Sequence, residues 1–252
     1  MWLRLRQIAF VAESLAPVEQ AIVDTLGVEV CFRDPGVATF GLENALFPIG
    51  NQLLEVVAPV QEGTAGGRYL ERRGGDGGYM IITQCDEHAP RKARVAELGI
   101  RKVLEHDSSE YRNMQLHPKD TGGTFFEIDQ QLGDNANEAD GPWHPAGPDW
   151  QRAKRTERVG GIVAAEVQCD DPETVAHRWS EIAEIPLNAD LSLTLDNATI
   201  RFVSCEDGRP EGLSEIDVVA NDAQAILAAA EQIDARRGDA QITLCGVRIN
   251  LV

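Results

Sequence analysis

At 252 residues, the chain is long enough to form one large domain or two smaller ones around a buried core. Its formal net charge of −18 argues against a nucleic-acid or anionic-membrane partner, because phosphate groups would be repelled. No apolar run approaches the ~18 residues of a membrane span, and the apolar stretch at 8–12 is too short for a signal peptide. Five widely spaced cysteines form no CxxC pair, so we expect reduced thiols and a cytoplasmic protein.

The first half of the chain shows the same order of elements twice: a strand, a helix and three further strands. Ser14 can cap the first helix and Gly27 can end it, while Pro90 and Gly99 delimit the second helix. Apolar runs between turn residues place the strands. The expected strands are 7–12, 28–32, 37–42 and 52–58 in the first round, and 79–85, 102–105, 111–116 and 124–129 in the second round.

The second half repeats this order twice more. Asp171 and Pro172 are typical of a helix start, and Asp196-Asn197 is typical of a hairpin turn. The third round is expected to have strands at 162–169, 191–195 and 199–204, and the fourth to have strands at 213–220, 241–244 and 247–252 with a helix at 222–233.

A segment rich in Gly, Pro, Asp and Asn separates the two halves and is typical of a linker. Its Trp143 and Trp150 indicate that it packs on a surface. We expect a first domain at 1–131, a linker at 132–158 and a second domain at 159–252. Internal repetition at this scale favours a fold made of four similar modules.

Three strands of the first half each place one oxygen-bearing side chain inside an apolar run. These side chains are Gln7, Glu55 and Glu127. A carboxylate left unpaired in an apolar interior costs several kcal/mol or becomes protonated. Convergence on a shared cation would reduce that cost, so the pattern suggests a metal site. A hydrogen-bonded core amide and buried or protonated acids remain alternatives.

Four βαβββ modules paired two and two resemble the vicinal oxygen chelate superfamily, which includes glyoxalases, methylmalonyl-CoA epimerase, extradiol dioxygenases and bleomycin-resistance proteins. The resemblance is strongest in the first half, in strand 7–11 (QIAFV), strand 54–59 (LEVVAP) and the hairpin 117–123 (HPKDTGG) before Glu127. It implies an α+β, glyoxalase-like fold with two paired-module domains. Each pair of modules would form a cup.

The resemblance implies metal ligands on the first and fourth strands of each module. Those positions are Gln7, Glu55, Met80 and Glu127. A histidine is expected where Met80 stands, and a thioether is a poor ligand for a hard divalent ion. Three oxygen donors still suit Mg²⁺, Mn²⁺, Fe²⁺ or Zn²⁺. His117, in the hairpin before Glu127, could add a nitrogen ligand.

Two functions follow from the resemblance. The first is a metal-dependent isomerase, epimerase or lyase, in which Glu127 or Glu55 removes a proton next to a carbonyl and the metal stabilises the enolate. The second is a metal-free protein that binds or sequesters a small molecule. The side chains expected to line the cup are Phe10, Phe40, Tyr79, Met80 and Phe125.

A local basic patch accompanies the expected cup entrance. Arg68, Arg72, Arg73 and Lys119 could hold a carboxylate, phosphate or coenzyme A tail, or they could form a solvated helix face. Whether the protein is a monomer or a homodimer is left open.

The second half is poorer in expected ligands. Arg201 and Arg248 stand where carboxylates would be expected, and Glu215 is the candidate anion. The His/His/Glu set that the extradiol dioxygenase type calls for is missing. We expect a structural duplicate with arginines paired to acids, or a domain whose two arginines grip an anion.

Overall fold

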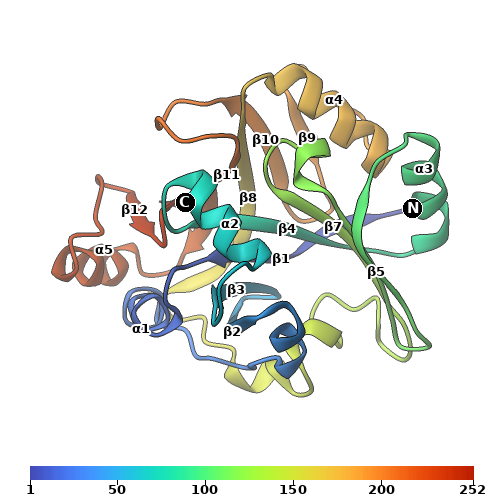
Figure 1. Cartoon of the computed structure of the whole chain (residues 1–252). Coiled ribbons are helices and arrows are strands. Elements are labelled where there is room, and N and C mark those ends of the chain that lie inside the picture. Colours follow the sequence, from blue (N-terminus) through green and yellow to red (C-terminus); the bar gives the residue numbers. More distant parts are fainter.

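The computed structural model describes residues 1–252 and contains two mixed β-sheets with helices packed around them (Figure 1). The first sheet has the strand order β2-β3-β1-β4-β7-β6-β5. Its strands are β1 (Leu3–Val11), β2 (Leu42–Ile49), β3 (Gln52–Pro59), β4 (Gly77–Cys85), β5 (Lys102–Asp107), β6 (Tyr111–Leu116) and β7 (Phe125–Gln131). At its centre β1 pairs antiparallel with β4, so two module sheets join edge to edge.

The second sheet has the order β12-β13-β11-β8-β10-β9 and is joined at its centre by the antiparallel pair β8 and β11. Its strands are β8 (Val159–Cys169), β9 (Ser192–Thr194), β10 (Thr199–Ser204), β11 (Gly212–Ala220), β12 (Gln241–Leu244) and β13 (Val247–Leu251). The two sheets thus repeat one topology, which confirms the predicted fold class.

Each module contributes one helix after its first strand, and a further helix joins the first two modules. These helices are α1 (Leu15–Leu26), α2 (Ala65–Arg73, the joining helix), α3 (His88–Glu97), α4 (Pro172–Ala183) and α5 (Ala223–Gln232). Four short 3₁₀ helices complete the chain: η1 (Pro35–Phe40), η2 (Pro118–Asp120), η3 (His144–Ala146) and η4 (Trp150–Ala153). No helix is both long enough and apolar enough to cross a membrane.

Only the second module keeps all three strands after its helix. In the other three modules the first of these strands is reduced to a single bridge, formed by Phe32 with Leu46, Leu187 with Leu193, and Arg236 with Ile242. The strand predicted at 28–32 is therefore wrong except for its last residue.

The strand predicted at 37–42 is also wrong, because most of this segment is the 3₁₀ helix η1. Asp34 accepts a hydrogen bond from the Gly36 amide, Pro35 occupies the first helical position, and Gly41 ends the helix with a φ of +70°. These features favour a capped turn over an extended strand. The strand β2 begins only at Leu42 and was not predicted.

The two sheets share one continuous core of 47 buried residues that also takes in α1, α4 and α5. Trp179 of α4 stacks on Phe126 of β7 at a centroid distance of 4.0 Å and donates a hydrogen bond to the Thr121 carbonyl at 3.2 Å. A second cluster of 16 buried residues covers the opposite face of the first sheet. We call that face, with Gln7, Glu55, Met80 and Glu127, the first cup.

Alternation along β1 assigns its side chains to these two faces. Ala9 and Val11 belong to the first cup, whereas Ile8 and Phe10 belong to the main core. Phe10 is therefore placed differently from the prediction, because a side chain three positions from Gln7 points to the other face of a strand.

The linker is held against the first sheet. Trp143 and Trp150 are each 1% exposed and pack in the first-cup cluster. The guanidinium of Arg6 lies over both indole rings, at 5.4 and 5.2 Å from their centroids. In Figure 1 this segment, coloured yellow-green, runs beside β2 and η1.

The turn between β2 and β3 docks closely on the second sheet. Gly50 has a φ of +61°, and a Cβ atom there would lie 2.1 Å from the Gly160 carbonyl oxygen. Gly63 has a similar φ of +73° but nothing within 4 Å of its Cβ position. Comparing the two glycines therefore distinguishes the cost of backbone strain from the cost of a steric clash with the second sheet.

Gly50→Ala should therefore lower the free energy of unfolding by about 2 kcal/mol more than Gly63→Ala, since both pay the strain of positive φ and only Gly50→Ala creates a clash. Urea unfolding of the two variants measures this difference. Equal losses would show that the turn can move away from β8 at no cost.

Candidate functional site in the first cup

Glu55 lies on the floor of the first cup between two amide side chains. Gln7 of β1 donates its amide N–H to Glu55 Oε2 at 2.9 Å, and Asn44 of β2 donates to Oε1 at 2.6 Å. Glu55 is 7% exposed, and Gln7 and Asn44 are 2% and 3% exposed. Both carboxyl oxygens thus have a donor from the protein.

The side-chain amides of Gln7 and Asn44 cannot exchange the positions of their oxygen and nitrogen atoms. The indole N–H of Trp143 donates to Gln7 Oε1 at 2.9 Å, and the backbone N–H of Asp34 donates to Asn44 Oδ1 at 2.8 Å. Because an indole or a backbone N–H can only donate, each amide must present its oxygen to that group and its nitrogen to Glu55. The site is therefore built to face Glu55 with two donors.

Glu127 of β7 has a similar pair of partners from the neighbouring strand β6. Asn113 donates to Glu127 Oε1 at 3.2 Å and Gln115 donates to Oε2 at 3.0 Å. Gln115 also lies 3.6 Å from the sulfur of Met80. The Asn113 side-chain oxygen has no hydrogen-bond partner, so this amide is not fixed as Asn44 is.

A third buried acid continues the row on β7. Asp129 accepts a hydrogen bond from the hydroxyl of Tyr111, and its other oxygen has no partner. Burial, together with the nearby charge of Glu127, holds the pKa of Asp129 well above its ordinary value. The first cup thus contains three carboxyls, of which two were predicted from the sequence.

Burial also raises the pKa of the other two acids. The pKa of Glu55 rises to about 7, because loss of hydration outweighs the two amide donors. The pKa of Glu127 is raised by the same cause, against the hydrogen bonds from Asn113 and Gln115. Glu55 therefore changes its charge near neutral pH.

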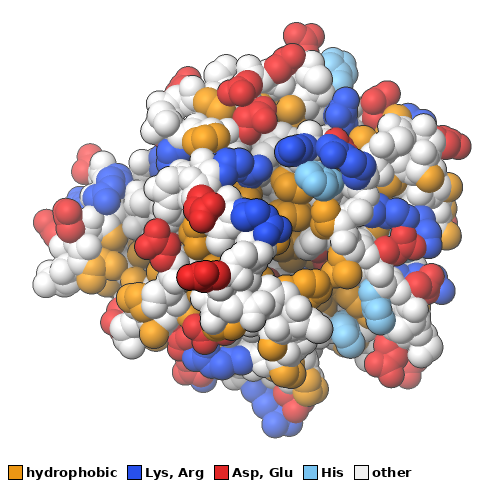
Figure 2. Space-filling model, viewed as in Figure 1, with side chains coloured by type: hydrophobic (Ala, Val, Ile, Leu, Met, Phe, Trp, Pro, Cys, Tyr) orange, Lys and Arg blue, Asp and Glu red, His pale blue; other side chains and the backbone are white.

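The walls of the first cup are aromatic. Tyr79 packs edge-on against Tyr69 and against Phe125, with both pairs of centroids 4.9 Å apart. Tyr79, Met80 and Phe125 are 6%, 7% and 8% exposed, whereas their neighbours Ile81 and Phe126 in the main core are 0% and 1% exposed. Figure 2 shows a hollow between α2 and the β5–β6 hairpin, with hydrophobic side chains exposed inside it. Tyr79, Met80 and Phe125 share the first-cup cluster with Tyr69 of α2 and Tyr111 of β6.

Basic side chains lie along the upper and left edges of this hollow in Figure 2. Arg72 of α2 lies 4.6 Å from the Tyr69 ring centroid and donates to the Gly123 carbonyl at 2.8 Å. Arg68 and Lys119 are exposed. His117 is half-buried, and burial together with the cations Arg101, Lys119 and Arg72 lowers its pKa. We call Arg68, Arg72, His117 and Lys119 the basic rim.

Two further residues differ from the sequence-based expectation. Phe40 is 52% exposed at the end of η1 and lies outside the first-cup cluster. Arg73 is buried and donates to the Pro210 carbonyl just before β11, so it links α2 to the second sheet and is not part of the rim. The structure brings Gln7, Glu55, Tyr79, Met80, Phe125 and Glu127 together in the cup cluster or on its polar floor.

The donor set does not fit a resident metal ion. Gln7 presents its amide nitrogen to Glu55 because Trp143 holds its oxygen, and Met80 is a thioether where a nitrogen ligand would be needed. The four oxygens of Glu55 and Glu127 each face an amide donor. No three His, Cys, Asp or Glu side chains lie close enough together to hold an ion.

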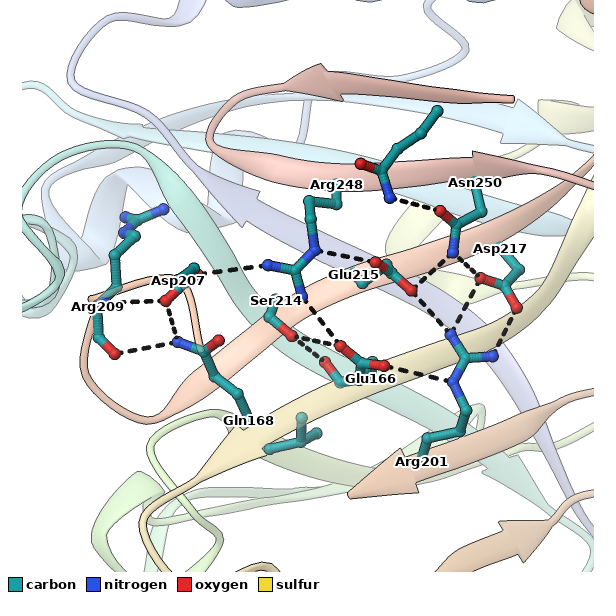
Figure 3. Close-up of polar contacts among 12 residues, drawn as sticks. Glu166, Gln168, Arg201, Asp207, Arg209, Ser214, Glu215, Asp217, Arg248 and Asn250 are labelled. Atoms are coloured by element: carbon teal, nitrogen blue, oxygen red, sulfur yellow. Dashed lines mark hydrogen bonds and ion pairs between the residues drawn. The ribbon is translucent and has the colours of Figure 1, made fainter. Parts of the chain in front are cut away.

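The corresponding face of the second sheet carries a network of ion pairs (Figure 3). Arg201 bonds to Asp217 at 2.6 Å and to Glu215 at 3.2 Å. Arg248 bonds to Glu215 at 2.9 Å and to Glu166 at 3.0 Å. This confirms that the two arginines are paired with acids, so their charges are balanced within the protein.

The fold is shared with known structures. No protein-family model and no curated protein matches the sequence. A triple mutant of 4-hydroxymandelate synthase from Streptomyces coelicolor aligns over 94% of this chain and 75% of its own, with 12% identity and a TM-score of 0.66.

Shorter proteins align with half of the chain. A variant of Streptomyces coelicolor methylmalonyl-CoA epimerase in complex with 2-nitronate-propionyl-CoA covers 53% of this chain and 100% of its own, at 22% identity and a TM-score of 0.47. The hypothetical protein BH1468 from Bacillus halodurans covers 53% and 99%, at 20% identity and a TM-score of 0.46. The long alignment and the repeated topology show that the chain has the vicinal oxygen chelate fold.

Sequence reasoning missed the amides that hold the acids. Asn113 and Gln115 follow Tyr111 at intervals of two along β6, and Asp129 follows Glu127 at the same interval, so strand alternation was the available signal. Asn44 could not be found this way because its strand was not predicted. Trp143 was expected to pack on a surface, but nothing in the sequence indicated its contact with Gln7.

The difference between the two acids can be tested by neutral replacement. In Glu55→Gln the new amide nitrogen faces the amide nitrogen of Gln7 or Asn44, and neither of these can rotate to offer its oxygen. This variant should therefore lower the free energy of unfolding by about 1–3 kcal/mol more than Glu127→Gln. Chemical unfolding at one pH compares the two variants. Equal stability would mean that the partners of Glu55 can reorient.

The raised pKa of Glu55 also predicts how stability depends on pH. Between its ordinary pKa and about 7, the folded state keeps a proton that the unfolded state loses, so stability should fall as the pH rises through this window. The contribution is up to about 3 kcal/mol. Unfolding midpoints across the window should fall less steeply in Glu55→Gln than in the unmodified chain. An unchanged slope in Glu55→Gln would contradict the assignment.

Proposed function

We propose that the protein binds a small organic anion with an apolar body in the first cup, without a resident metal ion. The observation that carries this proposal is the fixed orientation of Gln7, which turns a potential metal ligand into a hydrogen-bond donor to Glu55. Of the two functions considered from the sequence, this favours the small-molecule binding protein.

The walls and the rim suggest the chemistry of the ligand. Tyr79, Met80 and Phe125 offer an apolar surface that suits an aromatic or aliphatic group. The basic rim would hold the anionic end, and it stands out in a chain with a net charge of −18. The acids on the floor would accept hydrogen bonds from hydroxyl or amino groups that reach past the apolar walls.

A second candidate function is proton transfer, and the raised pKa of Glu55 favours it. A carboxyl group with a pKa of about 7 is suited to remove a proton next to a carbonyl at neutral pH. The amides on the floor already donate to the two acids, so the rim cations would have to stabilise an enolate oxygen. Ligand binding without catalysis requires no group that stabilises an enolate, so we propose it as the main function.

The binding proposal can be tested with 8-anilinonaphthalene-1-sulfonate, a fluorescent aromatic sulfonate. We expect saturable binding that Met80→Trp weakens by roughly tenfold or more, because the larger side chain fills the hollow. Val103→Trp is the matched control, since Val103 is exposed on β5 outside the first cup.

Equal binding by both tryptophan variants would place the probe elsewhere and contradict the proposal. The rim is tested in the same assay by Arg68→Gln. It should weaken binding of the sulfonate while leaving binding of an uncharged naphthalene analogue unchanged.

A further inference from the structure

A second hollow lies where the first sheet, the linker and the second sheet meet. It has a volume of about 630 Å³ and is lined by β1, the β2–β3 turn, both ends of the linker and the second sheet. Arg4, Arg6 and Lys154 are its basic residues, and Asp196 is the single acid in its lining. We call this hollow the interdomain groove.

The three cations of the groove bond only to neutral oxygens. Arg4 donates to the side-chain oxygen of Gln84 and to the Asn137 and Glu138 carbonyls, and Lys154 donates to the side-chain oxygen of Asn51. By contrast, Arg201 and Arg248 of the second sheet are balanced by carboxylates. Positive charge in the groove therefore remains available.

Arg6 places one of these charges deep in the wall. It is 1% exposed, it donates to the carbonyls of Asn51, Ala139 and Gly141, and its Nε has no partner. A charge shielded from water acts more strongly on its surroundings than an exposed one. Arg6 therefore adds to the positive field at the base of the groove without needing to touch a ligand.

The walls of the groove are fixed from both sides. Asn197 and Leu5 exchange two hydrogen bonds at 2.8 and 3.0 Å, which joins the β9–β10 turn to β1. Gln52 donates to the Ile162 carbonyl at 2.7 Å, which joins the β2–β3 turn to β8. A hollow held this way is pre-formed, so little ordering would be needed on binding.

Nearby acids reduce the positive charge but do not cancel it. Asp196 lines the groove, while Glu138 and Asp140 are exposed neighbours of Arg4 and Arg6. None of these three acids forms an ion pair with Arg4, Arg6 or Lys154.

We propose that the interdomain groove binds a small metabolite through a phosphate or carboxylate group held by Lys154 and Arg4. The shared chemistry is an oxyanion, and the size of the groove admits a molecule larger than the anion itself. This site is separate from the first cup and does not depend on what the first cup binds.

Calorimetric titration of the full chain at low ionic strength with inorganic phosphate, adenosine 5′-monophosphate and succinate tests the proposal. We expect one saturable site for at least one of these anions, weakened roughly tenfold by Lys154→Gln and by Arg4→Gln. Preference for phosphate or for succinate identifies which oxyanion the groove takes. Met80→Trp, which fills the first cup, should leave this binding unchanged.

Arg152→Gln is the matched control, because Arg152 is exposed on the same linker, lies 3.5 Å from Asp149 and does not line the groove. The proposal is overturned if none of the three anions binds saturably, or if Lys154→Gln and Arg152→Gln have the same effect. Lys154 makes a single hydrogen bond, to Asn51, so its variant is expected to fold normally.

Discussion

The hydrogen bond from the indole of Trp143 to Gln7 determines the character of the first cup. It joins a linker residue to a strand residue 136 positions earlier, and both partners are buried. Because the indole can only donate, Gln7 must turn its nitrogen toward Glu55. The position of Trp143 in the linker therefore determines which atom Gln7 turns toward Glu55. With the indole in place, Gln7 donates a hydrogen bond to Glu55 and does not offer its oxygen as a metal ligand.

Both sheets carry polar side chains on an inward face, but these side chains are stabilised differently in the two sheets. In the first cup Glu55 and Glu127 are 7% and 5% exposed and are held by neutral amides, whose hydrogen bonds only partly offset the rise in pKa that burial causes. On the second sheet the acids and arginines are 12–30% exposed and stay charged in pairs. Deeper burial favours neutral partners, since the cost of desolvating an ion grows as water is excluded.

Much of the fold followed from the sequence because it depends on local signals that repeat. Helix starts such as Asp171-Pro172 and the alternation of apolar residues located most elements, and their fourfold repetition gave the topology. Contacts between distant segments carry no such signal. The approach of Trp143 to Gln7 and the docking of Gly50 on Gly160 depend on tertiary packing, and both shape the candidate sites.

The metal content and metal affinity of the protein, prepared without chelators or nickel chromatography, test most directly whether the first cup is a hydrogen-bond network or a metal site. Elemental analysis should find no stoichiometric transition metal, and calorimetric titration with Mn²⁺ and Zn²⁺ should show no tight site in the first cup. The contrary result is one tightly bound ion per chain that is lost in both Glu55→Gln and Glu127→Gln. That outcome would show that Gln7 and the two acids act as metal ligands despite the hydrogen bond from Trp143.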